Sequence, residues 1–206
     1  EHYLAGGGLL SANLFHRRIR DLIRSETRLE DVPWSPVPRW VSRQVNVGDA
    51  RTTGVELEAK GRLDRLLEGA PRLDVNANLS LYRSAVDGVP GPDNRLDQQA
   101  GATLNLGGDY RLPGLPVKLG ANLNWVPGYR TQVSAEQWVA VSTRRVVDAY
   151  ALWTVNPTLG VRLSGSNLAP RDSVDSDSLR VGSARETAVT TAPSYANWQL
   201  RLEFRL

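Results

Sequence analysis

The feature of this sequence that most constrains its fold is the alternation of apolar and polar residues with a period of two. Over 73–82, leucine, valine and alanine occupy the odd positions and polar side chains the even ones. The same rule holds over 117–125, and over 196–206 with the apolar residues at even positions. Successive side chains of a β-strand point to opposite faces, so the pattern indicates strands with one apolar and one polar face.

Less regular alternation predicts further strands at 8–24, 40–61, 98–111, 138–154 and 159–168. The total is about eight strands, and Glu1 to Leu4 is interpreted as the tail of one that comes before them. Asp49 and Arg51 fall on the apolar parity of their segment, which a β-bulge near Gly48 would explain. No apolar run approaches the ~20 residues that a spanning helix needs.

The connections between these segments alternate in length. Short turns are expected at 5–8, 113–116 and 156–158, and a longer one with a short helical piece around its leucines at 62–71. Long polar loops are expected at 25–39, 84–97, 131–137 and 169–194. Short turns at one end and long loops at the other are typical of an outer-membrane β-barrel, with the turns in the periplasm and the loops outside the cell.

The same alternation could also belong to a soluble β-sandwich, whose apolar face would cover a dry core. Long segments, a polar face rich in Asn, Gln, Arg and Glu, and aromatic residues near strand ends favour the barrel. The predicted fold is therefore all-β, an antiparallel transmembrane β-barrel portion. The side chains expected to face lipid are Leu119, Leu123, Trp125, Trp198, Leu200, Leu202 and Phe204.

Composition argues against several classes of function. Cysteine is absent and only His2 and His16 could supply imidazole, so neither a zinc site of the usual kind nor a histidine-dependent triad is expected. We predict no catalytic residues, metal or cofactor. The net charge of +3 comes from interspersed charges, so nucleic-acid binding is not expected either. The basic cluster of residues 16–20 is interpreted as a solvated strand face rather than a polyanion site.

Residues 46–58 resemble the Asn-x-Gly-x-Ala-x-x-x-Gly-Val-Glu-Leu-Glu signature of TonB-dependent receptor barrels. The signature positions are Asn46, Gly48, Gly54, Glu56 and Glu58. Residues 14–23 resemble another strand of this family, and 163–168 resemble its penultimate strand with Asn167. The resemblance covers the whole chain, 1–206.

The resemblance implies a bacterial outer-membrane receptor with a barrel of about 22 strands closed around a plug. This chain is then expected to be the C-terminal portion of that barrel, without the plug and not transport-competent alone. The intact protein would take up a scarce nutrient such as a ferric siderophore. Its expected partners are the TonB system, through the plug and N-terminal region, the barrel-assembly machinery, and lipopolysaccharide and outer-membrane lipid. That machinery usually reads a terminal aromatic residue, whereas Arg205 and Leu206 follow Phe204 here.

Candidate ligand contacts lie in the long loops. Arg171, Arg180 and Arg185 could bind an anionic siderophore or a lipopolysaccharide phosphate, and Asp93 and Arg95 are similarly placed. For the acidic residues 172, 175 and 177, a solvated loop is favoured over a calcium site. Glu56 and Glu58 are expected to pair with Arg or Lys on adjacent strands rather than to act as acid and base.

Two alternatives stay open from the sequence. One is an autonomous small barrel of eight strands with a structural or adhesion role. The other is the soluble β-sandwich, acting as a binding module.

Overall fold

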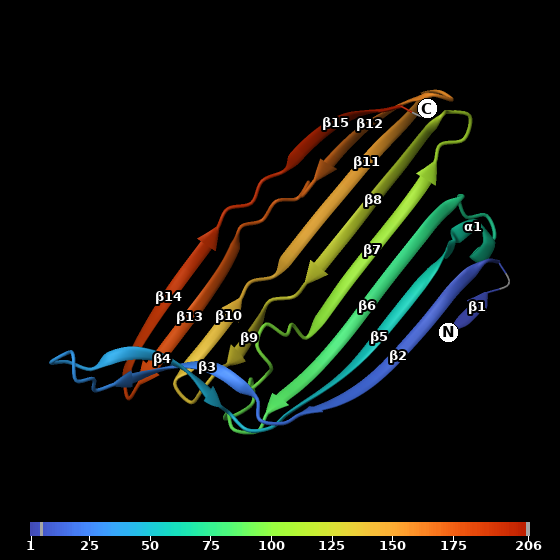
Figure 1. Cartoon of the computed structure of the whole chain (residues 1–206). Coiled ribbons are helices and arrows are strands. Elements are labelled where there is room, and N and C mark those ends of the chain that lie inside the picture. The colour runs from blue at the N-terminus through green and yellow to red at the C-terminus, as the bar shows by residue number, and fades with distance from the viewer. Residues whose placement is uncertain (5, 205–206) are drawn as a thin grey trace.

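A main sheet of nine antiparallel strands dominates the computed structural model, which describes residues 1–4 and 6–204 (Figure 1). Its spatial order is β1 (His2–Leu4), β2 (Gly8–Ile19), β5 (Ala50–Arg62), β6 (Leu73–Val86), β7 (Ala102–Arg111), β8 (Val117–Val126), β11 (Arg144–Asn156), β12 (Leu159–Ser166) and β15 (Asn197–Phe204). The eight strands expected from the alternation are all present, and the tail at the N-terminus forms the ninth. Spatial order follows chain order, so the sheet is an up-and-down meander.

Six further strands form two smaller sheets. β3 (Ile23–Glu30) pairs with β4 (Arg39–Asn46), while β9 (Tyr129–Gln132), β10 (Gln137–Val141), β13 (Ser173–Val181) and β14 (Ala184–Ala192) form a sheet in the order β14-β13-β10-β9. Each of the six continues a strand of the main sheet beyond a short break (Figure 1). We call this end of the main sheet the hairpin end and the opposite one the turn end.

Short connections close the turn end. The helix α1 (Leu63–Leu66) links β5 to β6, which confirms the expected helical piece, and Arg62 Nη2 lies 2.6 Å from Asp64 Oδ2 beside it. In the turn after β1, Gly7 N donates to Leu4 O at 2.9 Å; Ala5 lies outside the described residues. β1 and the last residues of β15 both lie toward this end of the sheet (Figure 1).

The main sheet has one polar and one apolar face, as the alternation predicted. Glu58, Asn78, Asn105 and Asn124 stand opposite one another across four strands. On the other parity, the apolar row of Leu57, Leu79, Leu104 and Trp125 crosses the same strands. We call these two sides the polar face and the apolar face.

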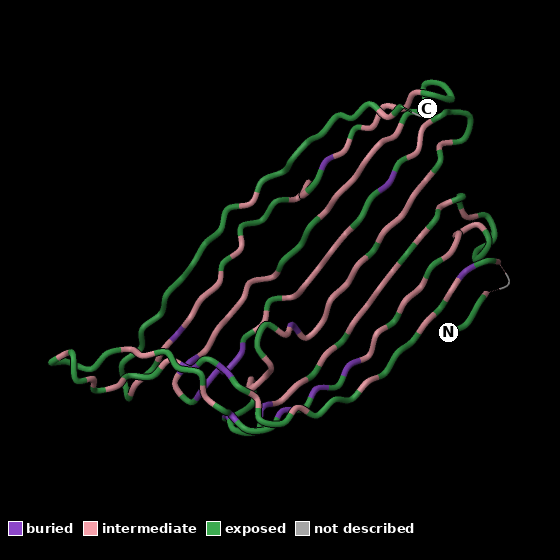
Figure 2. Tube along the Cα trace, in the orientation of Figure 1, coloured by how far each residue is buried: buried purple, intermediate pink, exposed green. Residues whose placement is uncertain are grey.

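Few apolar side chains are buried, and those few lie near the hairpin end. They are Val47, Ala50, Val86, Val89, Ala100 and Val133. Figure 2 shows most of the buried segments where the β3–β4 hairpin and the loops meet the main sheet. Within residues 1–4 and 6–204 no second sheet covers the apolar face, so the arrangement differs from a β-sandwich with a dry interior.

The long polar loops expected at 25–39, 131–137 and 169–194 are not free of strands. These segments contain paired strands, and 169–194 contains the whole β13–β14 hairpin. The reason is physical: β14 is exposed along its entire length, and a strand with water on both faces carries no apolar alternation. The loop expected at 84–97 does lack strands over most of its length, because β6 ends at Val86 and β7 begins at Ala102.

The predicted β-bulge near Gly48 is replaced by a break between two strands. β4 ends at Asn46 and pairs with β3, whereas β5 begins at Ala50 and pairs with β2 and β6. Gly48 lies between them with a φ of +85°, a backbone conformation that glycine adopts readily. Among the described residues, no helix has the length and apolarity needed to cross a membrane.

Candidate functional site

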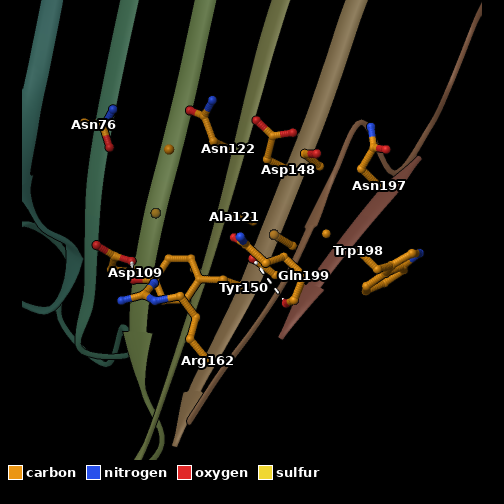
Figure 3. Close-up of a pocket in the computed structure, with 17 residues that line it drawn as sticks. Asn76, Asp109, Ala121, Asn122, Asp148, Tyr150, Arg162, Asn197, Trp198 and Gln199 are labelled. Carbon is orange, nitrogen blue, oxygen red and sulfur yellow. Dashed lines mark hydrogen bonds between the residues drawn. The ribbon is translucent and has the colours of Figure 1, made fainter. Parts of the chain in front are cut away.

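A hollow of about 750 Å³ lies at the middle of the polar face, and we call it the central hollow. Strands β6, β7, β8, β11, β12 and β15 supply its lining. Figure 3 shows Asn76, Asn122, Asp148 and Asn197 spread across the sheet above Asp109, Tyr150 and Arg162, with Trp198 apart from them on β15. Amide and carboxylate side chains from five strands therefore border this hollow.

The charges beside the central hollow are mutually compensated. The Tyr150 hydroxyl donates to the Asp109 carboxylate, and Lys118 Nζ lies 3.0 Å from Asp109 Oδ2. The Arg162 guanidinium stacks 4.5 Å from the centroid of the Tyr150 ring, and its Nε donates to Glu203 Oε1 at 2.6 Å. The network joins five neighbouring strands into one polar surface without a dominant charge.

Glycines leave room for aromatic rings on the polar face. A Cβ at Gly120 would overlap the Tyr150 ring and lie 2.6 Å from Asp109 Oδ1. A Cβ at Gly54 would lie 2.5 Å from Phe15 Cζ and 2.9 Å from a ring carbon of Tyr82. The signature residue Gly54 thus makes room for two rings from neighbouring strands.

The signature carboxylates Glu56 and Glu58 have structural partners, but not those expected. Glu56 accepts hydrogen bonds from Asn13 Nδ2 at 3.1 Å and from the Tyr82 hydroxyl at 3.4 Å. Glu58 forms an ion pair with Lys60 of its own strand. The expected pairing with Arg or Lys on an adjacent strand was wrong, because Lys60 lies on the same face of the same strand, two residues from Glu58.

The remaining signature residues shape the breaks between the main sheet and the hairpins. The Asn46 side chain accepts a bond from Gly48 N at 2.8 Å and donates to Asp21 Oδ1 at 3.0 Å. Asn167, with a φ of +52°, donates to Tyr195 O at 2.9 Å, and its backbone N donates to Asp148 Oδ1 at 2.8 Å. Asparagine tolerates the left-handed conformation and bonds local backbone groups, so both residues suit a sharp change of chain direction.

A second hollow, of about 910 Å³, lies on the polar face near the hairpin end, and we call it the hairpin-end hollow. Segment 96–100 forms part of its wall together with Arg17, Tyr129 and Arg144. Arg144 Nη2 lies 3.3 Å from Asp175 Oδ2, and the Arg17 guanidinium lies 5.1 Å from the centroid of the Phe15 ring. Burial raises the pKa of the Tyr129 phenol above its ordinary value.

A buried arginine holds the wall of the hairpin-end hollow in place. The Arg24 side chain is 1% exposed, and its Nη2 lies 3.0 Å from Asp97 Oδ1. Its guanidinium also donates to the carbonyls of Arg95 at 2.6 Å and Val133 at 3.0 Å. Arg24 therefore joins β3, the loop after β6 and the turn after β9. The sequence analysis missed it because a single arginine in a polar strand has no distinguishing pattern.

The candidate residues Asp93 and Arg95 belong to this same assembly through their backbones. Asp93 O accepts bonds from Gln132 N at 2.7 Å and Arg95 N at 2.8 Å, and Arg95 O accepts the bond from Arg24. Both residues are partly buried. Their backbone groups thus shape the loop.

The three candidate arginines of the segment 169–194 do not form one cluster. Arg180 and Arg185 stand opposite each other near the tip of the β13–β14 hairpin, and each hydrogen-bonds within the hairpin. Arg171 is exposed and precedes β13, so nearly the whole length of that strand separates it from the other two. A single small ligand could not contact all three.

The residues expected to face lipid all lie on the apolar face of the main sheet. On β15, Trp198, Leu200, Leu202 and Phe204 are between 57% and 70% exposed. On β8, Leu119 is 38% exposed, and Leu123 and Trp125 are partly covered by their neighbours. The continuation of this face at Leu206, like Arg205, lies outside the described residues.

No group of three or more His, Cys, Asp or Glu residues in the described part of the chain is arranged to hold a metal ion. The acidic residues considered for calcium have other partners. Asp172 Oδ1 accepts the backbone N–H of Ser194 at 2.9 Å, and Asp177 accepts bonds from the Gln137 amide.

The comparisons with known proteins agree with the topology. A family model described as TonB dependent receptor-like, beta-barrel matches residues 1–168. No curated protein and no solved structure matches the chain.

Proposed function

The chain belongs to the TonB-dependent receptor-like β-barrel family, and from that membership we propose that its main sheet forms one sector of the wall of an outer-membrane receptor. The family is one of outer-membrane transporters rather than enzymes. The proposed receptor binds a scarce nutrient such as a ferric siderophore outside the cell and imports it with force delivered by TonB.

The observation that carries this proposal is the exposed apolar face. Leu200 is 70% and Trp198 is 67% exposed on β15, and further leucines are exposed on β2, β5, β6 and β12. Soluble monomers rarely expose so large an apolar surface. Hydrocarbon is the solvent that suits such a surface, and the polar face would then meet water inside the barrel.

The open edges of the sheet support a wall larger than nine strands. Among the described strands, β1 pairs only with β2 and β15 pairs only with β12. A membrane strand must satisfy both rows of backbone groups, because the bilayer core offers no water to bond them. We propose that further strands of a barrel of about 22 continue both edges. An autonomous eight-stranded barrel would instead require one edge to pair with the other.

The two ends of the sheet then have different surroundings. The turn end lies in the periplasm, and the hairpins lie outside the cell. A ligand approaching from outside meets the hairpin-end hollow and the exposed side chains of Arg171, Arg180 and Arg185. Asp93 and Arg95 contribute through the wall that they shape. TonB acts through a plug and N-terminal region, and the barrel-assembly machinery and lipopolysaccharide are the other proposed partners.

Uptake of a panel of ferric siderophores, labelled with radioactive iron, tests the function. Bacteria that lack other siderophore receptors would express the receptor, with and without a working TonB. The proposal expects uptake of at least one ferric siderophore that requires both proteins. Uptake that is indifferent to TonB, or no uptake of any ferric complex by a correctly inserted receptor, would contradict it.

A further inference from the structure

The apolar face changes character near the hairpin end of β2, β5 and β6. Leu14, Val55 and Leu81 are the last large apolar side chains of this face on the three strands. Beyond them, the same parity carries His16, Arg18, Thr53, Arg51 and Arg83. A basic band therefore lies directly beyond the apolar surface, on the same side of the sheet.

The pairing of the strands brings these positive charges together. Arg18 stands directly opposite Arg51, and Arg83 stands opposite Thr53, whose Oγ1 lies 2.9 Å from Nδ1 of His16. Like charges that face each other across antiparallel strands are destabilising. A negative group bound between the two arginines would offset this repulsion.

The protein supplies only part of that compensation. Asp87 Oδ1 lies 3.7 Å from Arg51 Nη2, and Asp49 Oδ1 accepts the backbone N–H of Asp21 at 3.3 Å. Within the described part of the chain, Arg18, Arg20 and Arg83 form no ion pair within 4 Å, and all three are exposed.

A hollow of about 450 Å³ lies among these groups, and we call it the arginine hollow. His16, Arg18, Arg20 and Arg51 line it, together with the two carboxylates of Asp49 and Asp87. The hairpin-end hollow lies on the other face of the same strands. The alternate residues Phe15, Arg17 and Thr52 line it. The two hollows therefore open on different faces.

We propose that the arginine hollow binds the phosphate-bearing head group of a bilayer lipid, whose acyl chains lie along Leu14, Val55 and Leu81. Guanidinium groups bind phosphate through paired, charge-assisted hydrogen bonds. The position of the hollow fits a head group, because it lies where the apolar surface ends. A nucleic acid is a poorer occupant, since the adjoining leucines would stay exposed beside it. This inference rests on the proposed membrane location.

The test uses the intact receptor that carries this chain, purified in detergent and titrated with diphosphoryl lipid A under native mass spectrometry. The variant R18Q/R51Q/R83Q removes three charges of the basic band. The matched control R72Q/R111Q/R201Q removes three exposed arginines from the turn end and the polar face. We expect the first variant to weaken binding by about tenfold or more, and the control to bind as the parent does.

Further measurements distinguish a failure of the lipid site from a failure of the proposed membrane location. Dephosphorylated lipid A should bind the parent receptor as weakly as diphosphoryl lipid A binds R18Q/R51Q/R83Q, and millimolar inorganic phosphate should not displace the lipid. Equal binding of lipid A by both triple variants, or displacement of the lipid by free phosphate, would overturn the lipid site. Membrane insertion of the receptor, measured by heat-modifiable gel migration, would be unaffected in that case. A parent receptor that fails to insert into vesicles would overturn the membrane location, and the lipid site with it.

Discussion

Glycine at Gly54 and Gly120 is explained by what lies above each position rather than by backbone flexibility. Neither residue has a positive φ, but in both cases an aromatic ring from a neighbouring strand occupies the space where a Cβ would stand. A glycine in a strand often marks such a close approach. The ring of Tyr150, which also bonds Asp109, is oriented by the space that Gly120 leaves.

Substitution of this glycine should therefore destabilise the barrel. Gly120→Ala forces the Tyr150 ring and the Asp109 carboxylate to move, at a cost of about 1–3 kcal/mol typical of overpacking. The urea midpoint of unfolding from lipid vesicles measures it. Gly160→Ala is the matched control, because its nearest neighbour would be Leu152 Cδ1 at an ordinary 3.4 Å. Equal midpoints for the two variants would contradict this explanation of Gly120.

A pH-dependent contact lies in the β3–β4 hairpin. The hydrogen bond from Arg43, whose Nη2 lies 3.0 Å from Glu30 Oε2, lowers the pKa of Glu30 below its ordinary value of 4.5. A lowered carboxyl pKa in the folded state stabilises the hairpin above pH 4.5, and this contribution disappears as the pH falls through the lowered value.

We expect the tip of this hairpin, residues 31–38, to become more sensitive to pepsin, relative to the rest of the chain, as the pH falls below 4.5. In Glu30→Gln, cleavage of the tip relative to cleavage elsewhere in the chain should not change with pH, because residue 30 has no proton to gain. Limited proteolysis followed by mass spectrometry gives the comparison. Identical pH profiles for the parent and the variant would show that the Glu30–Arg43 pair contributes nothing.

At the scale of the strand, the part of the fold with one apolar face could be predicted from the sequence and the rest could not. β6, β8 and β15 were found because leucines alternate with polar residues along them. β14 was missed because its side chains are exposed along its whole length, and β13 because Ser, Asp and Arg occupy most of its positions, so that neither strand carries an apolar alternation. Their pairing comes from backbone hydrogen bonds, which leave no mark on the pattern of side chains.

The candidate site was predicted less well, for a related reason. Arg180 and Arg185 were grouped with Arg171 because they share one segment, but β13 separates them. Arg24 was missed because its partners are carbonyl groups and an aspartate more than 70 positions along the chain. Contacts between distant segments through the backbone have no signature in a single sequence.

The role of Arg24 as the connection between three segments can be tested directly. Arg24→Gln leaves Asp97 and the buried carbonyls short of donors, at a cost of about 1–3 kcal/mol. Amide hydrogen exchange should quicken over 93–97 and 132–134, and Arg24→Lys should give an intermediate result. Arg39→Gln, an exposed arginine of the same hairpin, is the control. Unchanged exchange in Arg24→Gln would show that the loops hold their positions without it.

For the whole molecule, the decisive property is that one sheet offers hydrocarbon-compatible side chains on one face and wettable ones on the other. Leu200 and Gln199 are neighbours on β15 and point to opposite faces. Substitutions at these two positions therefore compare the apolar face with the polar face at nearly the same place in the sheet. If the apolar face meets lipid, a charge at Leu200 must be buried in hydrocarbon, whereas a charge at Gln199 stays hydrated.

Leu200→Arg should therefore impair insertion far more than Gln199→Arg does. The expected penalty for an arginine near the middle of the bilayer is about 2–4 kcal/mol. Folded yield in lipid vesicles, read from heat-modifiable gel migration, provides the measurement. Equal yields for the two variants would remove the support for a lipid-facing surface.

The breaks that end the main sheet have one more consequence, for how such a chain can evolve. In an unbroken strand, adding a single residue turns every later side chain to the wrong face. Here the pairing of the strands is interrupted at Gly48 and at Asn167. An insertion or deletion in a hairpin therefore does not change which face the leucines of the main sheet occupy. The hairpins are thus free to diversify, or to be exchanged for those of another receptor, above a wall that stays unaltered.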